Sequence, residues 1–185
     1  HGKPEKHKNH LAGGCTYRRS VFEGRCGKMI RIGHGYDVHR FAAGRRLVLG
    51  GVEVPHTEGL LGHSDADALC HALTDALFGA VCLPDIGRHF PDSDPQYEGA
   101  DSLELLRRGY AEVLSTGFSL INADCTVIAE KPKLAPYIDA MRTAIASALS
   151  TDIANINIKA TTEEGLGIGG NGIGAHAVVL LEKKV

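Results

Sequence analysis

The sequence lacks the features of several non-globular protein classes. Its 185 residues are 43% apolar and 23% charged, with no low-complexity tract and no internal repeat. This composition excludes a disordered, collagen-like or coiled-coil chain and is typical of one globular domain. Charge or glycine interrupts every apolar stretch well short of the roughly 18 residues that a membrane-spanning helix needs. We therefore do not expect an integral membrane protein.

Closely spaced cysteine pairs are also absent. The five cysteines, at positions 15, 26, 70, 82 and 125, include no C-x-x-C pair. An odd and scattered set argues against a structural zinc finger and indicates a reducing compartment. A chain of this length buries about two-thirds of its unfolded surface on folding, so it needs no disulfide framework.

Basic charge is scarce outside the N-terminal segment. Residues 1–28 contain seven Lys or Arg and two acidic residues, a net charge of +5, whereas residues 29–185 carry −7. The acidic body argues against a nucleic-acid footprint. Residues 1–28 show no apolar periodicity, and we interpret them as a leader, linker or expression remnant. Residues 29–185 would then form a single folded domain.

Hydrophobic patterning predicts strands and helices in mixed order. We expect strands at 29–33, 119–131, 155–161 and 175–183, and a hairpin at 46–54 that turns at Gly50 and Gly51. Helices are predicted at 64–82 with Ser64 as a cap, at 101–116, and at 136–149. This order favours an α/β, α+β-like fold: a mixed four-stranded sheet with helices on one face, plus a small β-hairpin.

Three residues from two segments could bind a metal. In an extended chain Asp37 and His39 point to the same side, because strand side chains repeat every two residues. His71 falls on the polar stripe of the helix predicted at 64–82. One Asp and two His with an open fourth position suit a catalytic zinc site, although the spacing leaves manganese and iron open. The alternative is a surface pair and a solvated helix face.

Two further segments suit polar ligands. Glu164 precedes a stretch with six glycines among residues 165–174. Backbone N–H groups there could approach an anion and Glu164 could hold magnesium, unless the segment is only a flexible turn. Residues 85–92 mix two acids and two bases around Phe90, which we expect to be exposed. This loop could hold a hydroxyl-rich substrate or be a plain surface loop.

Several of these motifs, in order, resemble the 2-C-methyl-D-erythritol 2,4-cyclodiphosphate synthase family. The resemblance spans about residues 30–184 and rests on segments 31–39 (RIGHGYDVH), 62–67 (GHSDAD), 71–76 (HALTDA), 85–87 (DIG), 90–92 (FPD) and 159–162 (KATT). That family closes a cytidine-diphosphate derivative of methylerythritol 2-phosphate to a cyclic diphosphate and expels CMP, in non-mevalonate isoprenoid biosynthesis. It is a metal-dependent phosphorus–oxygen lyase.

The resemblance implies a role for particular residues. Zinc would be held by Asp37, His39 and His71, and magnesium or manganese by Glu164, while His63 and Thr162 would join these as catalytic residues. The substrate-binding positions would be His63, Ser64, Asp85, Gly87, Asp92, Ala129, Pro132, Lys133, Leu134, Ala160, Thr161 and Thr162. The family is a homotrimer whose active sites lie between subunits.

Two other functions remain open from the sequence. A zinc-dependent phosphohydrolase would use the same ligands to activate water. A non-enzymatic trimeric protein could bind isoprenoids or metal, although the complete ligand set argues against it. We expect a bacterial cytoplasmic protein, or a plastid one if residues 1–28 are the remnant of a transit peptide.

One segment departs from the family pattern. Many bacterial relatives have an aromatic residue, then Gly-Arg-Gly-Glu-Gly, lining a cavity on the trimer axis that can hold isoprenoid diphosphates. Here Ile168 stands at the aromatic position, and we match Asn171 to the Arg and Ile173 to the Glu. Neutral hydrogen bonds are about half as strong as charge-assisted ones. We therefore expect this chain to bind isoprenoid diphosphates weakly.

Overall fold

The computed structural model describes residues 27–184, which form one mixed sheet covered by helices. The sheet has the strand order β4-β1-β7-β5-β6. Its strands are β1 (Lys28–Ala43), β4 (Glu58–Leu60), β5 (Ser119–Ile128), β6 (Ile156–Thr161) and β7 (Gly172–Lys184). Only β5 and β6 pair in parallel, and the other neighbours are antiparallel. Strands β2 (Leu47–Leu49) and β3 (Val52–Val54) form a separate hairpin.

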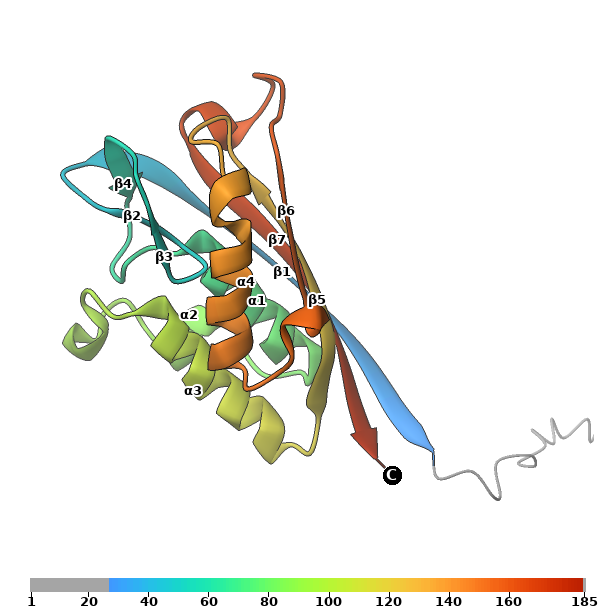
Figure 1. The fold of residues 1–185 in the computed structure, drawn as a ribbon. Coiled ribbons are helices and arrows are strands. Elements are labelled where there is room, and N and C mark those ends of the chain that lie inside the picture. The colour runs from blue at the N-terminus through green and yellow to red at the C-terminus, as the bar shows by residue number, and fades with distance from the viewer. Residues whose placement is uncertain (1–26, 185) are drawn as a thin grey trace, which may run out of the picture.

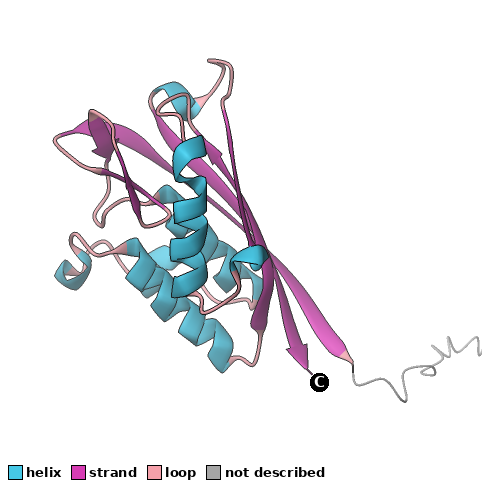
Figure 2. Cartoon of the chain, in the orientation of Figure 1, coloured by secondary structure: helices cyan, strands magenta, loops and turns pink. Residues whose placement is uncertain are grey.

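The main helices lie on one side of the sheet. They are α1 (Ala68–Ala80), α3 (Ser102–Ser115) and α4 (Ile138–Ala148), with a short α2 (Ile86–His89) beside them. Figures 1 and 2 show these helices on one face of the sheet, and among residues 27–184 no α-helix lies on the other face. The predicted mixed sheet with helices on one face and a small hairpin is confirmed. Within residues 27–184, no helix is long and apolar enough to cross a bilayer.

Helix α1 is the centre of the core. Leu69, Leu73 and Leu77 are fully buried along it, and Phe78 is fully buried as well. The second layer is the helix-facing side of β7, where every other residue from Ile173 to Leu181 has no exposed surface. Burying one such large apolar side chain contributes about 1.5–3 kcal/mol. The sequence predicts a polar stripe on helix α1, but in the structure the helix is buried on almost all sides.

The start of α1 differs from the prediction. The N-cap is Asp67, whose Oδ1 accepts from Leu69 N at 3.1 Å and Cys70 N at 3.0 Å, so the helix begins at Ala68 and not at residue 64. Ala66 has a φ of 59°, which no right-handed helix accommodates. The other Asp67 oxygen accepts from Gly51 N at 2.7 Å. One fully buried carboxylate therefore joins the hairpin turn to the first turn of α1.

The structure differs from the sequence-based expectations at several other points. Strand β1 starts at Lys28 and continues to Ala43, well past the predicted 29–33, and β4 is a fifth strand that the patterning missed. Phe90, expected to be exposed, is only 8% exposed. Ile173, which we matched to a glutamate of an axial cavity, is fully buried on the helix-covered face. Most of the segment at 1–28 lies outside the described residues.

Strand β1 and helix α1 are in backbone contact at two glycines. A Cβ atom on Gly33 would lie 1.9 Å from the Ala76 carbonyl oxygen, and one on Gly35 would lie 1.9 Å from that of Ala72. Real Cβ atoms never come this close, so only glycine permits the approach. The two alanines lie one turn apart on α1 and present the smallest side chains that a helix favours.

Gly35→Ala should therefore destabilise the protein by about 1–3 kcal/mol, because α1 must move away from β1 to admit the new methyl group. Gly79→Ala is the matched control, since its added Cβ would meet only the His34 carbonyl oxygen at 3.9 Å. In a helix that control should be neutral or stabilising by up to about 1 kcal/mol. Urea unfolding of both variants measures the difference. Equal stabilities would contradict the close approach.

Candidate metal centre and substrate pocket

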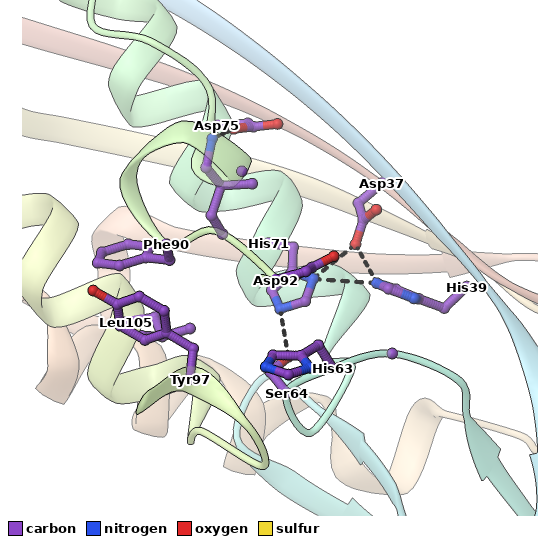
Figure 3. Close-up of a pocket in the computed structure, with 13 residues that line it drawn as sticks. Asp37, His39, His63, Ser64, His71, Asp75, Phe90, Asp92, Tyr97 and Leu105 are labelled. Carbon is purple, nitrogen blue, oxygen red and sulfur yellow. Dashed lines mark hydrogen bonds and ion pairs between the residues drawn. The ribbon is translucent and has the colours of Figure 1, made fainter. Parts of the chain in front are cut away.

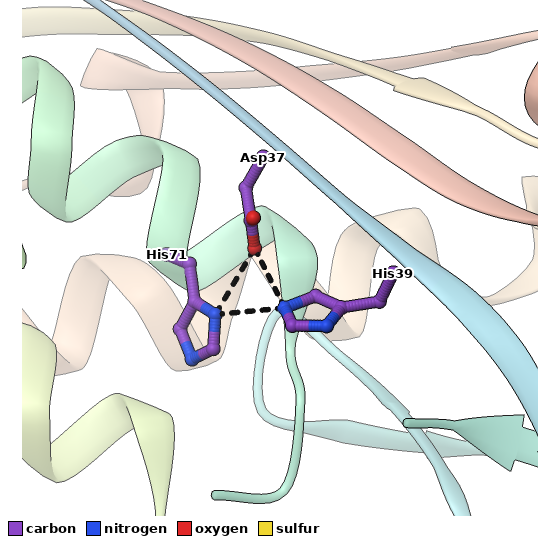
Figure 4. Close-up of side chains that lie close together, drawn as sticks. All are labelled: Asp37, His39 and His71. Atoms are coloured by element: carbon purple, nitrogen blue, oxygen red, sulfur yellow. Dashed lines mark hydrogen bonds and ion pairs between the residues drawn. The ribbon is translucent and has the colours of Figure 1, made fainter. Parts of the chain in front are cut away.

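The three candidate metal ligands meet at one point between β1 and α1. Asp37 and His39 continue the face of β1 that carries Gly33 and Gly35, and His71 lies in the first turn of α1 opposite them. Asp37 Oδ2 is 2.9 Å from His39 Nε2 and 3.0 Å from His71 Nδ1. The two ring nitrogens are 3.2 Å apart. Figure 4 shows the three atoms pointing toward one another.

This geometry fits a tetrahedral metal ion. Zinc–nitrogen bonds of about 2.0–2.1 Å place neighbouring ligand atoms about 3.3 Å apart, close to the three distances above. The side chains are only 14–26% exposed, so the ligands are shielded without being sealed off. Within residues 27–184, this is the one group of three His, Cys or acidic residues with converging ligand atoms. The Asp and two His that the sequence selected are therefore brought together.

The site is electrostatically ready for a cation. Burial alone would raise the pKa of Asp37, but hydrogen bonds from His39 and His71 hold it well below its ordinary value. Burial opposes the charged form of His39, yet the Asp37 carboxylate raises the pKa of His39 above its ordinary value. A metal ion must displace the proton that the Asp37 carboxylate stabilises on the His39 ring. Metal affinity therefore falls as the pH drops through the raised pKa of His39.

A cavity of about 190 Å³ opens beside the three ligands. Among its lining residues are four that the family resemblance selected as substrate contacts: His63, Ser64, Gly87 and Asp92. Figure 3 shows His71 at the centre of this pocket, with Asp37 and His39 on one side and Ser64 on the other. His63 Nε2 is buried without a hydrogen-bond partner, alone among side-chain nitrogens and oxygens of residues 27–184. Such an orphan polar atom requires a ligand or water.

Two acidic residues hold the first turn of α2 beside the pocket. Asp85 does not line the cavity, because its carboxylate caps α2 by accepting from Arg88 N. Asp75, which the sequence reasoning did not select, lines the cavity and accepts from Ile86 N at 2.7 Å. Burial raises the pKa of Asp75. Its position four residues after His71, on the same polar stripe, was the signal that could have identified it.

The predicted nucleotide positions line a second cavity of about 220 Å³. All seven are present, together with Glu130 and Ala135: Ala129, Pro132, Lys133, Leu134, Ala160, Thr161 and Thr162. No residue lines both this cavity and the one beside the metal ligands. In this chain the nucleotide positions and the metal ligands therefore form two separate sites.

The glycine-rich segment is less open to an anion than its sequence suggested. Glu130 Oε1 accepts from Glu163 N at 2.9 Å and from Gly165 N at 3.2 Å, and Glu163 Oε2 accepts from Gly169 N at 2.9 Å. The chain's own carboxylates occupy these donors. Glu164, at a φ of 53°, accepts from Thr162 Oγ1 at 2.7 Å and lines neither cavity.

Comparisons with known proteins indicate one family across nearly all of the residues that the structure describes. The YgbB family profile matches residues 30–182. The 2-C-methyl-D-erythritol 2,4-cyclodiphosphate synthase of Clostridioides difficile is 56% identical over 154 residues, covering 82% of this chain and 96% of the relative. The Vibrio vulnificus enzyme of the same name is 58% identical over 158 residues, covering 84% and 100%. The chain belongs to the YgbB family.

Solved structures support the family at the level of the fold. A CDP-bound 2-C-methyl-D-erythritol-2,4-cyclodiphosphate synthase superimposes with a TM-score of 0.76 at 40% identity, covering 82% of this chain and 99% of that one. The bifunctional IspDF of Campylobacter jejuni gives 0.82 at 45% identity, covering 85% of this chain and 43% of its own. This YgbB-family chain is a lyase of isoprenoid biosynthesis that catalyses the cyclodiphosphate synthase reaction.

His71→Ala should remove stoichiometric metal binding from this YgbB-family protein while leaving it folded. His71 faces the cavity and not the apolar core, so truncation removes a ligand with little loss of packing. His56→Ala is the control, because His56 does not belong to the three-residue group. Zinc content after exhaustive dialysis, with circular dichroism as the folding check, decides the matter. Full zinc stoichiometry in His71→Ala would refute the assignment.

Proposed function

We propose a residue-level mechanism for the cyclisation of 4-diphosphocytidyl-2-C-methyl-D-erythritol 2-phosphate. An oxygen of the 2-phosphate attacks the β-phosphorus of the diphosphate. The bond from that phosphorus to the bridging oxygen breaks, and CMP leaves with the bridging oxygen. The nucleophile belongs to the substrate, so the protein's task is to hold both phosphates in line and to neutralise charge.

Zinc and a second cation are part of the proposal. Asp37, His39 and His71 would hold zinc, which would neutralise developing charge on the phosphate oxygens when bound. Glu164 would hold magnesium or manganese, since these ions commonly take one protein carboxylate and complete their coordination with substrate phosphates and water. The exposed Glu164 carboxylate, anchored by the Thr162 hydroxyl, suits such a partial site.

The lining residues have matching roles. His63 would donate from its unpartnered Nε2 to a phosphate oxygen, and Ser64 lies at the same end of the cavity. Asp92 would accept from the methylerythritol hydroxyls, and the α2 segment with Asp85 and Gly87 would meet the ribose. The cavity at 129–135 and 160–162 would hold the cytosine and its phosphate, with Thr162 beside the reacting phosphates.

We also propose that three copies of the chain assemble with shared active sites. The face of the sheet without helices exposes apolar side chains, including Ile32 at 70%, Tyr36, Val38 and Val178. A contiguous apolar face of this kind marks an interaction surface. Each of the two cavities is smaller than the roughly 300–1,000 Å³ of a complete small-molecule site. One cavity from each of two neighbouring subunits would together hold the substrate.

The observation that carries this function is the convergence of Asp37, His39 and His71 beside the unpartnered His63. Incubation with the cytidylylated substrate in ¹⁸O-water, with and without a chelator, tests it. We expect CMP release that stops when metal is removed, and a cyclic diphosphate without solvent oxygen in its ring phosphates. Ring enrichment would indicate a metal-activated water and therefore a phosphohydrolase. An absence of CMP with metal present would favour a binding protein.

A further inference from the structure

His71 has polar partners on both of its ring nitrogens. Nδ1 faces the Asp37 and His39 ligand atoms, while Nε2 lies 3.0 Å from Ser102 Oγ and 3.2 Å from Ser64 Oγ. Ser102 is the first residue of α3 and is 1% exposed, so its hydroxyl has no access to solvent. A buried hydroxyl in this position must be explained by what it bonds.

The single proton of the Ser102 hydroxyl is already committed. Ser102 Oγ donates to Asp65 Oδ1 in a short hydrogen bond, because a carboxylate can only accept. The Ser102 oxygen can then serve His71 only as an acceptor. A proton on Nε2 of the neutral imidazole satisfies this contact and leaves the Nδ1 lone pair directed at the metal position, whereas an unprotonated Nε2 would face a Ser102 lone pair at 3.0 Å.

Asp65 is itself held firmly. Its Oδ2 accepts from Ser102 N at 3.1 Å, and its Oδ1 also accepts from Asp67 N at 3.3 Å. The Asp65 backbone N–H donates to the Ala100 carbonyl at 3.1 Å. A carboxylate beside the first turn of α3 is also favoured by the helix dipole. Asp65 thus fixes both the position and the rotamer of Ser102.

The Ser102 contact opposes a competing interaction inside the site. Asp37 Oδ2, 3.0 Å from His71 Nδ1, is a strong acceptor and by itself favours a proton on that nitrogen. A ring protonated at Nδ1 cannot bind a metal there. We propose that Asp65 and Ser102 are positioning residues that hold His71 as its Nε2–H tautomer and so raise the zinc affinity of the site.

This inference rests on the proposed use of Asp37, His39 and His71 as zinc ligands. Its test is the zinc affinity of Ser102→Ala, measured by competition with a chromogenic chelator. We expect a loss of about 10- to 100-fold, the usual effect of removing a hydrogen-bond partner of a metal-bound histidine. Asp65→Asn, which keeps an acceptor oxygen but weakens it, should show a smaller loss. Helix α3 keeps its own N-cap, Asp101, in both variants.

Ser115→Ala is the matched control, because this exposed serine of the same helix bonds only the Glu112 carbonyl. Its zinc affinity should equal that of the unmodified chain. A second readout is proton exchange at His71 Nε2, followed by nitrogen-resolved NMR of the zinc-loaded protein. The Nε2 proton should exchange slowly in the unmodified chain and in Ser115→Ala, and rapidly in Ser102→Ala.

The outcomes separate this inference from the proposed metal site. Suppose that His71→Ala abolishes zinc binding, while Ser102→Ala changes neither the zinc affinity nor the exchange rate of the Nε2 proton. This result would overturn the positioning role and leave the metal site intact. Zinc binding that is unaffected by His71→Ala would overturn the metal site. Parallel losses of affinity and of Nε2–H protection in Ser102→Ala and Asp65→Asn would support the positioning role.

Discussion

The close approach of β1 and α1 is the constraint on which the rest of the structure depends. Gly33 and Gly35 allow the helix backbone to lie against the strand at Ala72 and Ala76. Because strand side chains alternate, the face that carries the two glycines next carries Asp37 and His39. The spacing that packs the core therefore also fixes the distance from Asp37 and His39 to His71.

A second constraint holds the opposite side of the site. The loop before α1 uses its acidic residues internally: Asp67 joins α1 to the hairpin turn, and Asp65 joins the loop to α3. His63 and Ser64 lie in the same loop and line the cavity. Two residues that line the cavity are thus followed, within five positions, by two residues that anchor the fold. This arrangement keeps a polar site rigid next to a core made largely of alanine and leucine.

The sequence predicted those parts of the molecule that depend on short-range pattern. Alternation placed Asp37 and His39 on one face, and periodicity found α3. The start of α1 was misplaced because Ala66 takes a left-handed conformation that no local signal announced. Phe90 was misjudged and Ser102 unrecognised because their burial depends on elements distant in sequence. The link from Asp65 to Ser102 spans 37 positions, which no periodicity reveals.

The central claim is that one chain supplies the metal ligands while a neighbouring chain supplies the nucleotide pocket. A crystal structure with zinc and CDP, recorded at the zinc absorption edge, tests this claim most directly. The account predicts an anomalous peak between Asp37, His39 and His71, with cytosine seated against residues 129–135 of an adjacent subunit. Zinc at another position, or cytidine bound without contact to that cavity in any subunit, would contradict it.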